Sequence, residues 1–414
     1  MSNREENQKK KTIVIGGGAA GFFAAINLAL LDERHEVTIL EKTGKLLSKV
    51  RISGGGRCNV THSCFNHAEL VKNYPRGHRE LRQVFSRFDV QNTIDWFKER
   101  GVSLKTEEDG RMFPFSDSSE TIIDCFLNQC KLLGIRILTN TEVFSVKKEN
   151  EKFIVNTSGS EMYADHLIVA AGGHHKEGAY NWIRQTGHTI EPPLPSLFTL
   201  NMPGEIIRKE LQGVSVPCAS VKVKGSKQEY NGPLLITHWG ISGPAVLKLS
   251  AYAARELSAL NYTAEVHINW DARYSKNEML GLLKSLQKEK PRTLPATVAP
   301  VPLPKRLWEH LLKTAAMPEG RPWAEIGNKH TERLADVICG HVLKAEGKTT
   351  FKEEFVTCGG VTLKEIDFRT MESKIVRGLY FCGEVLDIDG ITGGFNFQAA
   401  WSTAWLCAHA ISVA

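Results

Sequence analysis

Three glycines near the start of the chain have the spacing of a phosphate-binding turn. They stand in the segment Gly16-Gly17-Gly18-Ala19-Ala20-Gly21. In such a motif the first glycine permits a tight turn, the second lets backbone amides approach a pyrophosphate, and the third lets a helix pack closely on a strand. The motif predicts a dinucleotide site at a helix N-terminus, although alone it also fits a glycine-rich turn before an ordinary helix.

A carboxylate follows at the position where a ribose needs one. Glu41 lies about 20 residues after the last glycine, at the end of an apolar segment. We expect it to accept hydrogen bonds from the hydroxyls of an adenosine ribose. These residues require a strand over 12–15, a helix over 19–31 and a strand over 36–41, and the hydrophobic pattern predicts all three. The fingerprint does not separate FAD from NAD.

A second glycine-rich segment, SGGGRCNVT at 53–61, is flanked by basic side chains. Its consecutive glycines leave backbone amides uncovered, and Lys49, Arg51 and Arg57 are placed to face a phosphate or a flavin edge. A flexible surface loop is the alternative, but a charged loop so close to a dinucleotide motif favours a site. Cys58 is expected to be a buried, inert thiol rather than a reactive one.

The strand expected over 163–171 ends in Gly172-Gly173, where a strand end meets a ligand crevice. The next two residues, His174 and His175, are interpreted as solvated side chains rather than catalytic groups. The expected helices over 80–100 and 119–133 and the strands over 135–155 show no chemistry of their own.

The C-terminal region repeats the arrangement of a strand, a loop and a helix. The strand expected over 379–384 runs into an acidic loop, in which Glu384 or Asp387 is a candidate ligand of ribityl hydroxyls. Amides of residues 394–396, near a helix expected over 399–411, are placed to stabilise negative charge on a reduced flavin ring.

The segment Thr237-His238-Trp239-Gly240-Ile241-Ser242-Gly243-Pro244 combines a titratable group, an aromatic ring and a tight turn. Those are the ingredients of a substrate wall over a flavin, and His238 is the candidate proton donor. The structural alternative is the start of a helix over 245–257, with Ser242 as its N-cap and Pro244 in its first turn.

Length and composition indicate a globular protein of two or three domains. The chain has 414 residues, a net charge of +6 and nine cysteines without a CxxC pair, so a metal site is not expected and a reduced, cytoplasmic protein is. No apolar run reaches the length of a membrane span. The positive charge reads as spread along the chain, which disfavours nucleic acid as a partner.

Domain boundaries are less sharply marked. Pro192-Pro193-Leu194-Pro195-Ser196 is the clearest boundary signal, and short strands follow it. Helices are expected over 276–288, 305–315 and 331–344, with a proline-rich connector over 291–304.

Taken together, these motifs resemble the HI0933/YhiN family of FAD-binding oxidoreductases, which includes proteins described as aminoacetone oxidase-like and as 3-dehydro-bile-acid Δ4,6-reductase-like. The resemblance covers nearly the whole chain and rests on GGGAAG at 16–21, SGGGRCNVT at 53–61, GRMFP at 110–114, THWGISGP at 237–244, TMESK at 370–374 and GEVLDIDGITGGFNFQ at 383–398. One departure is the segment 174–178, where many relatives carry Gly-Ser-Thr-Gly-Asp-Gly. We therefore assign residues 174–178 no contact with substrate or nicotinamide on the basis of the relatives.

The resemblance implies an α/β fold: a Rossmann-like, glutathione-reductase-like FAD-binding domain with an inserted β-barrel and helical domain. The FAD-binding domain is expected over 1–195 and 351–414, and the insert over 196–350, with the barrel at 196–272 and 319–350 and a helical subdomain at 273–318. The insert would roof the flavin, whose ring would lie between segments 54–59 and 392–396. The expected cofactor-binding residues are Gly16, Gly18, Ala19, Ala20, Gly21, Glu41, Lys42, Lys49, Ser53, Gly54, Gly55, Gly56, Arg57, Cys58, Asn59, Val143, Ala171, Gly172, Gly383, Glu384, Asp387, Thr392, Gly393, Gly394, Phe395 and Asn396.

The expected function is that of an FAD-dependent oxidoreductase that transfers hydride through flavin N5. We expect NAD(P)H as a transient reductant, because the sequence has no second GxGxxG motif, and a small enone-type molecule as the substrate. The alternatives are a flavin-dependent amine oxidase that uses oxygen, a flavoprotein that acts on tRNA, and a redox flavoprotein without enzymatic activity.

Overall fold

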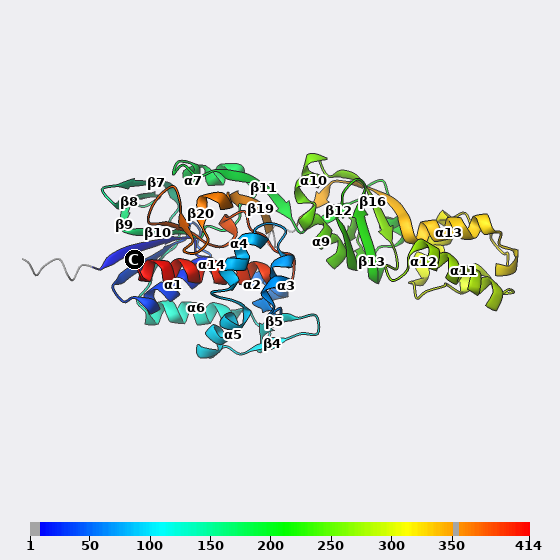
Figure 1. Cartoon of the computed structure of the whole chain (residues 1–414), viewed down its shortest axis with the longest axis horizontal. Helices are drawn as coiled ribbons and strands as arrows, with labels where there is room; N and C mark the ends of the chain where they lie inside the picture. Colours follow the sequence, from blue (N-terminus) through cyan, green and yellow to red (C-terminus); the bar gives the residue numbers. More distant parts are fainter. Residues whose placement is uncertain (1–8, 351–355) are drawn as a thin grey trace, which may run out of the picture. The chain divides into compact units, whose positions relative to one another are not determined.

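The computed structural model describes residues 9–350 and 356–414, which form two units (Figure 1). The first unit contains residues 9–195 and 356–414, and the second contains residues 196–350. The boundary expected at residue 351 lies outside the described residues. Each unit has a hydrophobic core of its own.

The first unit is built on a seven-stranded sheet in the order β20-β21-β22-β10-β1-β2-β6. The five strands from β22 to β6 run parallel. Parallel strands are covered on both faces, which explains why the last four residues of β1 and the last three residues of β10 are buried. The bounds are β1 Lys10–Ile15, β2 His35–Leu40, β6 Arg136–Leu138, β10 His166–Val169, β20 Ile366–Asp367, β21 Glu372–Ser373 and β22 Leu379–Phe381.

Two helices, α1 (Ala19–Leu31) and α14 (Phe395–Ser412), pack against each other in this core. The rings of Phe23 and Trp401 join them with centroids 5.2 Å apart. The remaining elements of the unit are α2 Ser48–Gly56, β3 Thr61–His62, α3 His67–Leu70, η1 Val71–Asn73, α4 His78–Phe85, α5 Val90–Glu99, β4 Leu104–Thr106, β5 Arg111–Pro114, α6 Glu120–Leu132, β7 Val143–Glu149, β8 Lys152–Thr157, β9 Glu161–Ala164, η2 Glu177–Tyr180, α7 Asn181–Arg184, β11 Ile190–Ser196, β19 Val356–Val361, η5 Leu363–Glu365 and η6 Gly383–Val385.

The second unit is a seven-stranded sheet with helices at one end (Figure 1). Its strand order is β17-β16-β13-β14-β15-β12-β18, and Gly347 alone joins β17 to β18. Since these are the first and last strands in the order, the sheet closes into a barrel. The bounds are β12 Thr199–Asn201, α8 Ile207–Glu210, β13 Ser215–Val223, β14 Glu229–Ile236, β15 Gly240–Ser242, α9 Pro244–Tyr252, α10 Ala254–Ala259, β16 Thr263–Asn269, α11 Lys276–Glu289, η3 Pro295–Thr297, α12 Lys305–Thr314, η4 Trp323–Glu325, α13 Asn328–Gly340, β17 His341–Glu346 and β18 Lys348–Thr349.

The proline-rich segment at 192–196 contains the division between the two units, after Pro195, and it also belongs to the edge strand β11, which pairs with β19. Two expected helices differ from the structure. The helix expected over 331–344 ends at Gly340, where the sequence changes to the buried-exposed alternation of β17. The helix expected over 245–257 is two helices, α9 and α10, and the N-cap of α9 is Gly243 rather than Ser242.

The excess positive charge is not spread evenly between the units. Residues 196–350 contain 21 Lys and Arg against 14 Asp and Glu, a balance of +7. The rest of the chain therefore carries −1 of the total of +6. This corrects the interpretation from the sequence that the positive charge is spread along the chain.

No helix in the part of the chain that the structure describes combines the length and apolar character that crossing a bilayer requires.

The half-buried His166 of β10 gives a pH-dependent contribution to stability. Burial lowers its pKa to about 4, so below pH 6.5 the unfolded chain binds a proton that the folded chain does not bind. The free energy of unfolding should therefore fall as the pH is lowered from 6.5 to 4. We expect His166→Leu to lower the slope of the free energy of unfolding against pH. The decrease should correspond to at most about one bound proton. Urea unfolding at several pH values measures the slope, and an unchanged slope in the variant would contradict the assignment.

Candidate functional site

The three glycines of the N-terminal motif differ in what surrounds them. A Cβ on Gly16 would lie 2.2 Å from the carbonyl oxygen of Ala170, and one on Gly21 would lie 1.9 Å from that of Gly16. Close packing of α1, β1 and the end of β10 therefore requires both glycines. A Cβ on Gly18 would meet no protein atom within 4 Å. Gly18 thus borders open space, as a residue that a ligand approaches should.

The first residues of α1, Ala19 and Ala20, stand next to this space. The first amides of a helix have no helical carbonyl to bind and carry the positive end of the helix dipole. The turn can therefore donate hydrogen bonds to a pyrophosphate without any basic side chain.

Glu41 follows β2 directly, and its carboxylate is held by the backbone. One oxygen accepts a hydrogen bond from Gly17 N at 2.9 Å, and the other accepts from Thr43 N at 2.9 Å and Thr43 Oγ1 at 2.8 Å. A carboxylate has about four acceptor sites, so it is oriented but not saturated. The remaining sites suit ribose hydroxyls.

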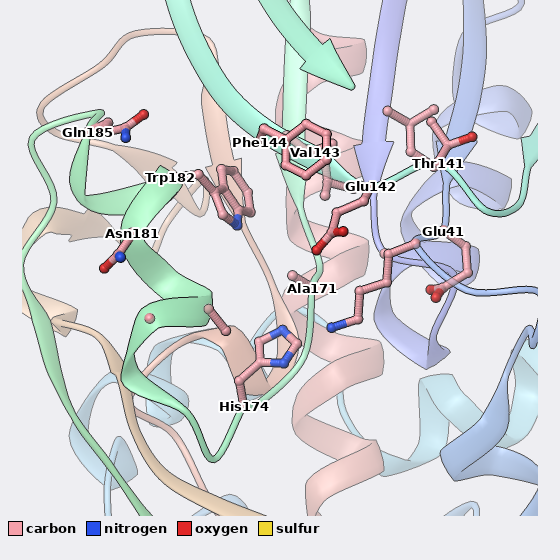
Figure 2. Close-up of a pocket in the computed structure, with 16 residues that line it drawn as sticks. Glu41, Thr141, Glu142, Val143, Phe144, Ala171, His174, Asn181, Trp182 and Gln185 are labelled. Carbon is pink, nitrogen blue, oxygen red and sulfur yellow. The ribbon is translucent and has the colours of Figure 1, made fainter. Parts of the chain in front are cut away.

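A cavity of about 240 Å³ opens beside the glycine turn (Figure 2). It lies at the carboxyl ends of β1 and β2, where open α/β sheets bind their ligands. Its walls include five expected site residues, namely Gly16, Glu41, Lys42, Val143 and Ala171. The structure thus brings the glycine turn, the acid and the first residue of β7 to one cavity.

Two aromatic side chains that were not predicted from the sequence form part of the cavity wall. Phe144 of β7 and Trp182 of α7 both line it (Figure 2). The helix that carries Trp182 has only four residues, too few to give a hydrophobic period. Planar apolar rings close to the ribose-binding acid suit a purine base.

His174 also lines the cavity, which corrects its interpretation as a solvated side chain. Burial, together with the charges of Lys42 and Lys49, lowers its pKa to about 4. Its backbone N donates to Tyr180 Oη at 3.0 Å, which fixes the loop. The imidazole is therefore neutral at pH 7. His175 is exposed, as expected.

The second glycine-rich segment lies at the end of α2, where the backbone leaves the helical conformation. Regular helix breaks at Ser53, and the following three glycines have positive φ angles. A Cβ on Gly54 would lie 2.7 Å from the ring of Phe113, whereas one on Gly55 or Gly56 would meet no protein atom within 4 Å. The segment therefore presents a bare backbone on one side, as a ligand wall would.

The basic side chains of this segment have carboxylate partners of their own. Lys49 Nζ lies 2.5 Å from Glu384 Oε2, and Arg57 Nη1 lies 2.5 Å from Glu107 Oε1. Arg51 pairs with a carboxylate of α6. Backbone amides are consequently better placed than these cations to meet a phosphate. Cys58 is fully buried, and burial raises the pKa of its thiol to about 12, in agreement with the expected inert cysteine.

Segments 54–59 and 392–396 touch each other directly. The side-chain amide of Asn59, oriented so that both of its ends are satisfied, accepts from Gly394 N at 3.0 Å and donates to Thr61 O at 3.0 Å. A Cβ on Gly394 would lie 2.5 Å from the same Thr61 oxygen. The two segments are therefore in contact at Asn59 and Gly394, and the Gly394 amide is already used by Asn59.

Most residues of the turn before α14 are engaged in contacts within the protein. Phe395 is buried and stacks on His62 with ring centroids 4.7 Å apart. The side chain of Asn396 closes the turn through two hydrogen bonds to the backbone of Gly390, at 2.8 and 2.9 Å. Thr392 is exposed and Gly393 half-buried, so these two remain open to a ligand.

The remaining expected residues lie at the ends of β10 and β22. Gly172 has a φ of +72° and no protein atom where a Cβ would point, so it borders open space. A Cβ on Gly383 would lie 2.8 Å from the Cβ of Ala20, which keeps β22 close to α1. Glu384 and Asp387 each accept a hydrogen bond from a backbone N–H of β19, at 2.8 and 3.0 Å.

His238 lies in the second unit, in the turn between β14 and β15. Its exposed imidazole contacts Trp239, with ring centroids 4.6 Å apart. Thr237 closes the turn, since Gly240 O accepts from its backbone N at 2.7 Å. Ser242 accepts a hydrogen bond from Thr199. The turn is rigid at its base and presents two aromatic rings outward.

The sequence matches the model of the HI0933-like protein Rossmann domain over residues 10–410. This chain belongs to that family. The HI0933-like chain is 32% identical to a ribosomal RNA dihydrouridine synthase of Haemophilus influenzae, over 95% of this chain and 96% of the relative. It is 31% identical to a protein of the same name from Escherichia coli, over 90% of this chain and 91% of the relative.

A third relative is a 3-dehydro-bile acid Δ(4,6)-reductase of Clostridium scindens, 28% identical over 94% of this HI0933-like chain and 96% of the relative. Among solved structures, a 3-ketosteroid Δ1-dehydrogenase of Sterolibacterium denitrificans matches with a TM-score of 0.51 and 12% identity, over 98% of this chain and 100% of that chain. That match confirms the two-part fold expected from the sequence.

The family and the geometry of the site agree. Bare glycines at a helix N-terminus and an oriented carboxylate at the end of the second strand fit the pyrophosphate and ribose of FAD. This HI0933-like protein is accordingly an FAD-dependent oxidoreductase.

Proposed function

We propose that this HI0933-like protein reduces the C5=C6 bond of a uracil base in ribosomal RNA. The observation that carries the proposal is its likeness, over at least nine-tenths of the chain, to two ribosomal RNA dihydrouridine synthases. The balance of +7 in residues 196–350 also suits a polyanionic substrate. The proposal replaces our sequence-based expectation of a small-molecule substrate without nucleic acid.

The chemistry is addition of a hydride and a proton to an activated double bond. In uracil the C5=C6 bond is conjugated with the C4 carbonyl, so hydride adds at C6 and the proton at C5. Bound FAD supplies the hydride after its own reduction. We further propose NADH or NADPH as a transient source of that hydride.

The site residues have defined roles in this proposal. The amides around Gly18 hold the pyrophosphate, Glu41 holds the ribose, and Trp182 with Phe144 covers the adenine. The bare backbone at Gly55 and Gly56 forms part of the wall beside the flavin.

His238 is our candidate for the acid that protonates C5. We expect His238→Ala to lower the rate of substrate reduction by about a hundredfold, because general acid catalysis contributes on that order, and to leave reduction of FAD by the nicotinamide unchanged. Stopped-flow absorbance separates the two half-reactions. His330→Ala, which removes another histidine of the same unit, is the matched control. Full turnover by His238→Ala would exclude this role.

A small enone is the second candidate substrate, favoured by the relative that reduces a 3-dehydro bile acid. The two candidates share one chemistry, a carbon–carbon double bond conjugated with a carbonyl group.

The experiment that distinguishes them starts from the anaerobic, nicotinamide-reduced protein. We expect protein-free ribosomal RNA to restore the flavin absorbance quickly, and a steroidal enone to restore it slowly or not at all. Restoration by the enone alone would overturn the RNA proposal in favour of the second candidate. A flavin that neither NADH nor NADPH bleaches would overturn the nicotinamide proposal.

A further inference from the structure

Four cations lie close together at the end of α11 and in the turn that follows it. They are Lys284, Lys288, Lys290 and Arg292, here called the cation strip, and all four are exposed. Glu289 is the single acid among residues 284–292. Lys284 and Lys288 are four residues apart and therefore share one face of the helix.

The opposite face of α11 is part of the core. Met279, Leu283 and Leu286 are buried, and the helix packs on α13. The packing fixes α11 in rotation, so the face with Lys284 and Lys288 points to solvent. Lys284 and Lys288 are thus presented on a rigid helix, and Lys290 and Arg292 continue the strip in the turn that follows it.

Ion pairing does not account for the strip. Within the described residues none of its four cations has an ion-pair partner, whereas Lys276 at the other end of α11 pairs with Asp336 at 2.5 Å. Interaction with the helix dipole favours cations only in the last turn. The dipole therefore accounts for the position of Lys288 but not for the positions of Lys284 and Arg292. Like charges placed together repel one another, so a polyanionic partner would be stabilising here.

We propose that the cation strip binds the phosphate backbone of the RNA substrate. This inference rests on the proposed function for the choice of RNA as the polyanion. Phosphate contacts position a nucleic acid without reading its sequence. The strip therefore contributes affinity and orientation, while the choice of uracil is made where the base is reduced.

The test compares two variants that each lose four positive charges. The strip variant carries Lys284→Ala, Lys288→Ala, Lys290→Ala and Arg292→Ala. The control carries Lys98→Ala, Lys131→Ala, Lys147→Ala and Lys364→Ala, all exposed cations of the first unit without ion pairs in the described chain. Binding of fluorescent, protein-free ribosomal RNA is measured by anisotropy at several salt concentrations.

For the strip variant we expect affinity at least about tenfold weaker at moderate salt. The plot of log K against log salt should be flatter by about 0.7 to 0.9 for each cation that contacts a phosphate. The control should bind within about twofold of the unchanged protein. A version with arginine at the three lysine positions should retain binding, and equal circular dichroism spectra and thermal unfolding curves in all variants show that they fold.

Failure of this inference is separable from failure of the proposed function. If dihydrouridine forms but the strip variant binds RNA with unchanged affinity and slope, the inference is wrong and the function stands. A different outcome is that the strip variant weakens RNA binding, and the control variant does not, while the unchanged protein forms no dihydrouridine. In that case the cation strip binds RNA as inferred, and the proposed function is wrong. An equal loss in both variants indicates a general charge effect and also overturns the inference.

Discussion

Gly18→Val is expected to give a folded protein that retains no FAD. A Cβ at position 18 meets no protein atom within 4 Å, and the φ of this residue is −97°, which any residue adopts. The folded apoprotein therefore has room for the new side chain. The bound pyrophosphate does not, because it needs the same space and the amides behind it.

We expect the affinity for FAD to fall by a factor of about one hundred or more, the value of one or two lost charge-assisted hydrogen bonds. Flavin absorbance of the purified protein and titration with FAD measure the loss, and thermal unfolding of the apoproteins checks the fold. Gly281→Ala is the control. A Cβ on Gly281 also meets no protein atom within 4 Å, but Gly281 lies in α11 of the second unit and not in the glycine motif. Retention of FAD by Gly18→Val would place the pyrophosphate elsewhere.

Breaking the ion pair between Arg76 and Asp389 is expected to destabilise the first unit strongly. The Asp389 side chain is fully buried and that of Arg76 is 10% exposed. Their contact includes a hydrogen bond of 2.5 Å from Arg76 Nε to Asp389 Oδ1. Arg76→Met leaves a buried carboxylate without its cation, which costs about 3 to 5 kcal/mol in comparable cases.

The double variant Arg76→Met with Asp389→Leu tests the reason for this loss. It removes both charges, so we expect it to recover a large part of the stability lost in Arg76→Met. Urea unfolding of the three proteins gives the comparison. If the double variant is as unstable as the sum of the single variants, lost packing rather than an uncompensated charge is the cause.

The N-terminal part of the site could be predicted from sequence because its signals are local. The bounds of α1 agree with the predicted helix over 19–31, and Glu41 follows its strand as expected. Each role in the glycine motif depends on neighbours within one βαβ unit, so a short segment carries the full signal.

Features that depend on distant residues could not be predicted. The partner of Arg57 is Glu107, on the β4–β5 hairpin, and the Gly394 amide is taken by Asn59, more than 300 residues away. Trp182 reaches the cavity from a helix too short to show a period. The charge difference between the units, in contrast, could have been found from the sequence, because the expected insert over 196–350 has the bounds of the second unit.

Nucleoside mass spectrometry tests the central claim most directly. The purified protein, loaded with FAD, is incubated without oxygen with NADH or NADPH and ribosomal RNA freed of protein, and the RNA is then digested to nucleosides. Our account predicts new dihydrouridine, two hydrogen atoms heavier than uridine, which is absent when FAD is removed or when Gly18→Val replaces the unchanged protein. An FAD-loaded protein that is reduced by the nicotinamide yet forms no dihydrouridine would contradict it.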